Sequence, residues 1–232
     1  MMYRLFVLIF LFQTPVVLSQ RIFYTSGIMV SHLHLSKSYY SSYYDYHYDQ
    51  SMSLDPIVST SISVGYETKQ WHRFSIAATA SNFNSGGKIS ASLPYVSNGK
   101  RVTFNNTCLG ASVNYYIINR KTQFYIGIGP RIDYLKPDYE MYNLLEYYED
   151  RPLHIFKPGL SGSIGFNYQV GDFSWGLKSN YYYRFGNTLE LTDSYSSGSG
   201  YESHHKVVKD FAYDLQFILG YQFGKKKKAE HP

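Results

Sequence analysis

One cysteine, Cys108, occurs in the sequence, and after residue 20 no apolar run is long enough to form a transmembrane helix. A single thiol excludes an internal disulfide. Because a membrane-spanning helix needs about 20 consecutive apolar residues, the rest of the chain argues against a helical membrane protein.

The central part of the chain also lacks an excess of either positive or negative charge. Of the 22 lysines and arginines, Arg4 and the run Lys225–Lys228 lie outside residues 20–224, and within that segment basic and acidic residues nearly balance. A basic nucleic-acid-binding domain keeps its positive charge in the fold. We therefore expect no nucleic-acid partner.

The N-terminus predicts a secretory signal peptide over residues 1–19. Arg4 supplies positive charge, residues 5–12 are apolar, and short residues precede an expected mature start at Gln20. The apolar run is too short to span a membrane as an anchor. The remaining sequence suits one domain at 20–224, followed by a basic tail at 225–232 that we expect in the periplasm.

Alternation of apolar and polar residues is the strongest pattern present. From Phe211 to Phe223 every odd position is Phe, Tyr or Leu, whereas the even positions include Asp214, Gln216 and Gln222. Such a strand turns one face to an apolar medium and the other to polar groups. A transmembrane β-strand needs about 9–11 residues of this pattern. A mean hydropathy of −0.30 agrees, because apolar residues alternate with polar or small ones.

Eight segments alternate in this way, and in most of them one face carries small and polar residues, as a narrow filled lumen requires. They are Tyr24–Ser36, Pro56–Glu67, Arg73–Asn82, Thr107–Ile118, Gln123–Tyr134, Gly159–Val170, Phe173–Phe185 and Phe211–Phe223. Short and long connections between them alternate, as periplasmic turns and extracellular loops do. The sequence predicts an all-β fold, an eight-stranded antiparallel up-and-down transmembrane β-barrel.

The turns fix which residues face outwards. Gly171-Asp172 predicts a type II′ turn that pairs Val170 with Phe173 on the outside. Asn98-Gly99 predicts a type I′ hairpin, and Ser197–Gly200 a hairpin tip between the last two strands. These hairpins are expected above the membrane; the alternative, a ten-stranded barrel, would bring one of them into the bilayer.

The first strand has two conflicting patterns. Leu33 and Leu35 favour odd positions outwards, with the neighbouring histidines inside, whereas Ile28 and Val30 favour the reverse. A β-bulge near Val30 would reconcile them.

Residues 20–224 resemble the small OmpA/OmpX-like outer-membrane barrels of Gram-negative bacteria. The resemblance rests on the signal, the strand pattern, the alternating loops and the aromatic last strand. It implies localisation in the outer membrane, with outer-membrane lipid, lipopolysaccharide and the assembly machinery as partners. Phe223 is similar to the terminal Phe that this machinery recognises, although nine residues follow it. No cofactor is expected.

Charged residues on the lumen faces form the first candidate site. They are Glu67, Arg73, Arg131, Asp133, Arg184 and Asp214. They could line a pore or polar site, or form structural ion pairs. An eight-stranded interior only just holds its own side chains, which favours ion pairs. We expect Glu67 and Arg73 at the periplasmic end, and Arg184 and Asp214 in one packed cluster near the other end.

Tyrosines in the first long loop form the second candidate site. They are Tyr39, Tyr40, Tyr43, Tyr44, Tyr46 and Tyr48. Tyrosine offers rigid contact area and a hydroxyl, so these residues suit binding of an extracellular ligand. The alternative is aromatic packing near lipopolysaccharide headgroups.

Histidines near serines and acids leave an enzymatic alternative. His32 and His34 lie near Ser31 and Ser36, and His204-His205 lies near acidic residues. Lipid A acylases and deacylases are small barrels with His, Ser and acid chemistry, but no spacing here matches a motif. We therefore predict no catalytic residue and no metal site. The favoured function is a structural or cell-surface interaction role, with a lipid-modifying enzyme or a narrow channel as alternatives.

Overall fold

The computed structural model describes residues 20–90, 98–145, 153–197 and 200–223, so the predicted signal peptide and basic tail lie outside the described residues. No helix within them has the length and hydrophobicity to cross a membrane. The elements are β1 (Gln20–Ser41), β2 (Tyr46–Ser53), β3 (Asp55–Glu67), β4 (Phe74–Lys88), β5 (Arg101–Asn119), β6 (Thr122–Pro137), α2 (Tyr139–Leu145), β7 (Ile155–Val170), β8 (Phe173–Arg184), β9 (Leu189–Ser197) and β10 (Gly200–Phe223).

The strands form one antiparallel sheet that closes into an eight-stranded ring. Its order is β1-β3-β4-β5-β6-β7-β8-β10, and β1 closes it by pairing with β10 from Gln20↔Phe223 to Ser41↔Glu202. The other two strands, β2 and β9, are not part of the ring. They pair with the parts of β1 and β10 that extend beyond one end of it. The predicted eight-stranded barrel is confirmed, and the ten-stranded alternative is wrong.

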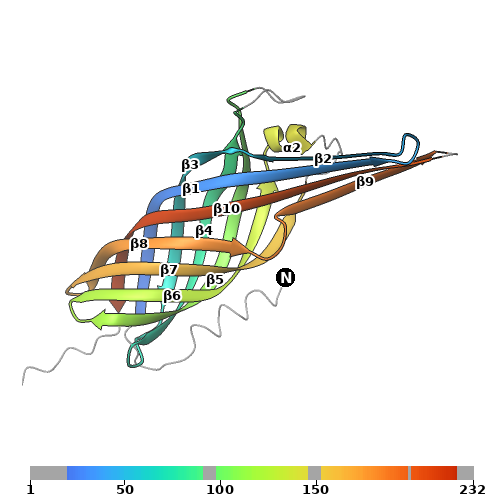
Figure 1. The fold of residues 1–232 in the computed structure, drawn as a ribbon. Helices are drawn as coiled ribbons and strands as arrows, with labels where there is room; N and C mark the ends of the chain where they lie inside the picture. The colour runs from blue at the N-terminus through green and yellow to red at the C-terminus, as the bar shows by residue number, and fades with distance from the viewer. Residues whose placement is uncertain (1–19, 91–97, 146–152, 198–199, 224–232) are drawn as a thin grey trace, which may run out of the picture.

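Four strands project together beyond the ring as a sheet of order β2-β1-β10-β9 (Figure 1). The short connections lie at the opposite end. The projecting strands include most of Lys37–Asp55 and Gly186–Asp210, which sequence analysis treated as loops, although it expected the hairpin tip at Ser197–Gly200. The β1–β2 hairpin was missed because almost every residue of β2 is exposed, so no long apolar ridge marks it as a strand.

The outward face of the ring is apolar at mid-height and aromatic at both ends, as a bilayer requires. Ile76, Ile128 and Leu215 are 58%, 63% and 50% exposed along the belt. Aromatic pairs lie near each end. They are Phe74–Tyr115 and Phe173–Tyr221 at the short-turn end, and Tyr183–Phe185 and Tyr134–Phe156 at the other. This belt would be costly in water and is stable in lipid.

Glycines shape two of the turns. Val170 pairs with Phe173, and Gly171 between them has a φ of +62°, as the first residue of a type II′ turn requires. That prediction is confirmed. Gly99, the second residue of the predicted Asn98-Gly99 turn, has a φ of +85°, as the second central residue of a type I′ turn requires. Residues 91–97 lie outside the described residues, so the type I′ turn stays a prediction.

The expected bulge in the first strand is also wrong. Pairing of β1 with β10 is continuous, and Leu33 and Leu35 point inwards, 1% and 2% exposed, with His32 and His34 on the outside. The apparent change of face arises because the interior itself changes from polar to apolar towards the projecting sheet.

Cysteine labelling tests which end of the barrel faces outwards. In a Cys108→Ser background, Asn98→Cys is expected to react with a membrane-impermeant maleimide on intact cells, because it lies at the β4–β5 tip. Asp172→Cys, in the β7–β8 turn, is expected to react only after the outer membrane is permeabilised. Labelling of Asp172→Cys on intact cells would reverse the topology.

Candidate functional site

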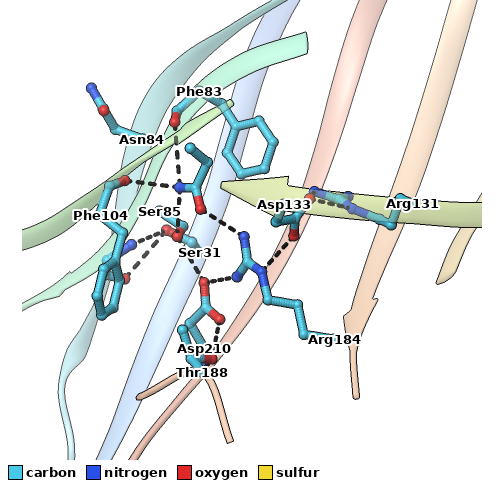
Figure 2. A network of polar contacts seen from close by, with 12 residues as sticks. Ser31, Phe83, Asn84, Ser85, Phe104, Arg131, Asp133, Arg184, Thr188 and Asp210 are labelled. Carbon is cyan, nitrogen blue, oxygen red and sulfur yellow. Dashed lines mark hydrogen bonds and ion pairs between the residues drawn. The ribbon is translucent and has the colours of Figure 1, made fainter. Parts of the chain in front are cut away.

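Polar side chains fill the inside of the barrel in layers, and Figure 2 shows the layer nearest the projecting sheet. Its centre is the guanidinium of Arg184, at the end of β8. Arg184 Nε donates to Asp133 Oδ2 at 2.5 Å, Nη2 donates to Asn106 Oδ1 at 2.7 Å, and Nη1 is paired with Asp210. All four side chains are buried, so their charges are satisfied within the layer rather than by bulk water.

Asp210 was missed by sequence analysis because it was placed in a loop, one residue before the last predicted strand. Thr188 Oγ1 donates to its Oδ1 at 2.6 Å and Ser85 Oγ donates to its Oδ2 at 2.7 Å. The carboxylate is therefore bonded from β4, from Arg184 at the end of β8, and from the connection between β8 and β9. The Arg184–Asp210 ion pair therefore stabilises the barrel wall at the connection between β8 and β9.

Arg131 and Asp133 extend the same layer. The Arg131 guanidinium is paired with Asp133, and its Cζ lies 4.0 Å from the centre of the Tyr182 ring. The structure thus brings together three of the predicted residues, Arg131, Asp133 and Arg184, as an ion-pair cluster.

Asp214 lies one layer further down and is not the partner of Arg184. It accepts hydrogen bonds from Asn180 Nδ2 at 2.6 Å, Tyr182 hydroxyl at 2.7 Å and Gln216 Nε2 at 2.7 Å. The strand register explains the correction, because Asp214 pairs directly with Asn180, four residues before Arg184 on β8. The expected contact between Arg184 and Asp214 is wrong.

The lowest layer surrounds Glu67. Its carboxylate is paired with Arg21, accepts from Asn114 Nδ2 at 3.0 Å and accepts from the Tyr116 hydroxyl at 2.5 Å. Arg73, which was expected to face the lumen at the same end, is exposed in the turn before β4. The turn is tighter than expected, with a bridge between Trp71 and Phe74, and this leaves Arg73 outside the lumen. Its assignment to the lumen is therefore wrong.

An apolar layer closes the interior above the polar layers. Its buried members are Leu33, Leu35, Leu54, Ile89, Val102, Phe104, Leu135, Met141, Leu144, Leu145, Leu189 and Val208. We call this set the apolar plug. Three members lie on α2, which starts after Asp138. Asp138 Oδ1 accepts from the Met141 backbone N–H at 2.7 Å, as an N-cap does. Burial raises the pKa of Asp138, although its hydrogen bonds from Thr103 and Met141 oppose the rise.

Little free space remains in the middle of the barrel. A cavity of about 30 Å³ lies among small polar side chains and Arg131, Lys178 and Gln216. It has room for a water molecule or two, not for a solute. Buried polar side chains surround this cavity, and the buried apolar plug lies above them.

The six candidate tyrosines do not form one cluster. Tyr39, Tyr46 and Tyr48 share the face of the projecting sheet that continues the lumen, and Tyr40 lies on the opposite face. Tyr43 and Tyr44 occupy the turn between β1 and β2. A one-residue change of position reverses the face on a strand, and this separates Tyr40 from Tyr39.

On the inner face, aromatic rings lie side by side. Tyr39 is 4.7 Å from His204 and 6.2 Å from Tyr46, centre to centre, and Tyr46 stacks on Tyr48 at 6.4 Å with the rings 7° apart. The Tyr39 hydroxyl donates to Glu202 Oε1 at 3.1 Å. We call Tyr39, Tyr46, Tyr48 and His204 the aromatic shelf.

Two serine hydroxyls lie beside His34. Its Nδ1 lies 3.1 Å from Ser53 Oγ, and its Nε2 lies 3.4 Å from Ser36 Oγ. Both ring nitrogens thus contact hydroxyls, and within the described residues no carboxylate is bonded to His34 to orient the ring. A hydrolytic triad needs that third group. The described part of the chain also holds no cluster of three or more potential metal ligands.

No protein-family model matches this chain, and no curated protein sequence does either. Solved structures are similar. The outer membrane protein OprG from Pseudomonas aeruginosa has a TM-score of 0.52 and 13% identity, over 89% of this chain and 97% of that one. Neisserial surface protein A has a TM-score of 0.46 and 15% identity, over 86% and 99%.

At these identities the similarity shows the fold alone. The chain has the fold of the small outer-membrane β-barrels, which confirms the OmpA/OmpX-like architecture expected from the sequence. This fold and the exposed apolar belt together make the chain an outer-membrane barrel.

Proposed function

We propose that the chain is a non-enzymatic outer-membrane protein with a structural or cell-surface interaction role, and that its projecting sheet binds a partner outside the cell. The observation that carries the proposal is the sheet β2-β1-β10-β9. Its upper part is not needed to close the ring, yet it holds the aromatic shelf away from the bilayer. Such rigid aromatic area with nearby hydroxyls is typical of binding surfaces.

The filled interior supports this proposal over a channel. A conducting pore needs a continuous polar path, but the apolar plug lies above buried ion pairs. Both ring nitrogens of His34 contact serine hydroxyls and, among the described residues, neither contacts a carboxylate, which supports the proposal over a lipid-modifying enzyme.

Partners in the membrane follow from the outer wall. The apolar belt and its aromatic ends suit outer-membrane lipid and lipopolysaccharide, and the aromatic strand ending at Phe223 suits the assembly machinery. We propose no cofactor and no nucleic-acid partner. The signal peptide at 1–19 and the basic tail at 225–232 remain predictions.

Binding by the aromatic shelf is tested with the folded barrel in nanodiscs against immobilised glycans and extracellular matrix proteins. The variant Tyr39→Ser/Tyr46→Ser/Tyr48→Ser is expected to lose binding at least tenfold, because it removes the stacked rings. Tyr40→Ser is the matched control, since it changes a tyrosine on the opposite face of the same strand.

Two results would contradict the proposal. Equal loss of binding in the Tyr40→Ser control would show that the shelf has no special role. Steady ion conductance of the wild-type barrel in a planar bilayer would instead favour the channel.

A further inference from the structure

The barrel wall is interrupted where β8 ends. β10 pairs with β9 over Gly200–Val208 and with β8 over Ala212–Tyr221, so Lys209–Phe211 has no strand beside it on that side. Gly186 takes the backbone out of the sheet at this point with a φ of +72°, a conformation that favours glycine. Figure 1 shows the break between the end of β8 and the start of β9. A cavity of about 230 Å³ lies there, and we call it the wall recess.

The wall recess opens to the outside of the barrel and not to the lumen. Its exposed side chains are Tyr183, Lys209 and Phe211, which all lie on the outward faces of β8 and β10. Arg184 and Asp210 also line it, but they are buried and paired with each other, so they form its floor. An occupant therefore comes from the medium that surrounds the wall.

The height of the wall recess determines what that medium is. Tyr183 packs edge-on against Phe185 in the aromatic end of the belt nearest the projecting sheet. Such aromatic ends lie at the level of the lipid headgroups. With the projecting sheet outside the cell, as the proposed function requires, the recess lies beside the headgroups of the outer leaflet. Its occupant is then a lipid headgroup rather than a soluble molecule.

The sign of charge around the recess favours an anionic headgroup. Lys209 is exposed and forms no ion pair within the described residues. Between the two aromatic ends, the outward positions of the described ring strands carry no aspartate or glutamate. Glu190 lies higher, on β9, and is bonded by Asn187 Nδ2 at 3.0 Å. The Lys209 ammonium is therefore available to a membrane anion.

Rings beside Lys209 suit a sugar. Phe211 stacks on His32 of β1, with ring centres 5.3 Å apart and planes 16° apart, and His34 is the cross-strand neighbour of Lys209. An aromatic face attracts the C–H groups of a sugar ring because its π-electrons are negative. Imidazole N–H groups and the Asn187 amide in the lining can bond to sugar hydroxyls. A phosphate carried on a sugar therefore satisfies more of these groups than a phosphate carried on glycerol.

We propose that the wall recess binds the phosphorylated sugar headgroup of an outer-leaflet glycolipid, which is the headgroup chemistry of lipopolysaccharide. The phosphate accepts hydrogen bonds from the Lys209 ammonium, and the sugar lies against Phe211 and Tyr183. The acyl chains continue along the apolar belt over Tyr213 and Leu215, which are exposed below the recess on β10. This site rests on the proposed orientation of the barrel and assigns the proposed lipid partner to one place on the wall.

The probe is a diphosphorylated, acylated glucosamine disaccharide (lipid A), offered to the full-length barrel in nanodiscs of phosphatidylcholine. Native mass spectrometry counts the glycolipid that stays bound. We expect wild type to retain it and Lys209→Gln to weaken retention about fivefold or more, the effect of one cation beside a membrane anion. Lys136→Gln is the matched control, because it removes a cation that is exposed on the outward face of β6 near the same aromatic end but outside the recess. It is expected to bind like wild type.

Chemical controls separate this lipid from others. The site is wrong if Lys136→Gln lowers retention as much as Lys209→Gln, because any cation at this level would then suffice. It is also wrong if wild type retains no glycolipid, if the same lipid without phosphates is retained equally, or if phosphatidylglycerol at equal concentration displaces the glycolipid fully.

Failure of the aromatic shelf is distinguishable from failure of this site. Tyr39→Ser/Tyr46→Ser/Tyr48→Ser leaves the wall recess intact and is expected to retain the glycolipid, whatever it does to binding outside the cell. Labelling of Asp172→Cys on intact cells would instead place the recess at the inner leaflet and overturn the orientation on which the site rests.

Discussion

Replacing Arg184 with Ala is expected to destabilise the folded barrel by about 3–5 kcal/mol, because two buried carboxylates lose their shared cation. Asp133 keeps Arg131 as a partner, but Asp210 keeps only neutral donors, among them Thr188. The measurement is equilibrium unfolding by guanidinium chloride in lipid vesicles, followed by tryptophan fluorescence.

Two comparisons make this result specific. Arg73→Ala, in the exposed turn, is expected to change the free energy of unfolding by less than about 0.5 kcal/mol. Arg184→Ala/Asp210→Asn is expected to recover part of the loss, because the unpaired charge is gone. If Arg184→Ala is as stable as Arg73→Ala, water reaches the layer and the lumen is more open than the structure shows.

Replacing Leu215 with Arg is expected to cost about 2–4 kcal/mol, the penalty for a cation near the bilayer midplane. Leu215 is 50% exposed on the outward face of β10 and lies in the middle of its ring-forming part. The same unfolding experiment measures the loss.

The control is a second arginine substitution on β10, at a position outside the bilayer. Ser203→Arg places the same side chain on the same face of β10, but in the projecting sheet, where it meets water. We expect its free energy of unfolding to stay within about 0.5 kcal/mol of wild type. Similar losses at both positions would mean that Leu215 does not face lipid.

The ring was predictable because lipid imposes one rule on every strand that crosses it. The outward face must be apolar over about 10 residues, so period-2 alternation marks each crossing, as in Phe211–Phe223. Above the membrane this constraint ends. Residues on both faces of Tyr46–Ser53 are exposed, and the pairing of this strand with β1 is visible only in three dimensions.

The sequence predicted which side chains face the lumen better than it predicted which of them bond to each other. Inward orientation follows from parity, which placed Arg131, Asp133 and Arg184 correctly, but pairing depends on the stagger between strands. Two residues that bond inside the lumen, Arg21 and Asp210, were not among the predicted site residues. The predicted strands began too late to include them. Arg73 shows the opposite error, a strand started one residue too early.

The closing pair of strands has a consequence for how the molecule folds. Gln20 pairs with Phe223, so the contact that seals the cylinder joins the first and last strands of the chain. Contacts this distant in sequence carry a high entropic cost and form slowly. Until the final strand is complete, β1 presents a long unpaired edge, which is a template for aggregation. We therefore expect that covering this edge until the C-terminal strand arrives raises the yield of folded barrel.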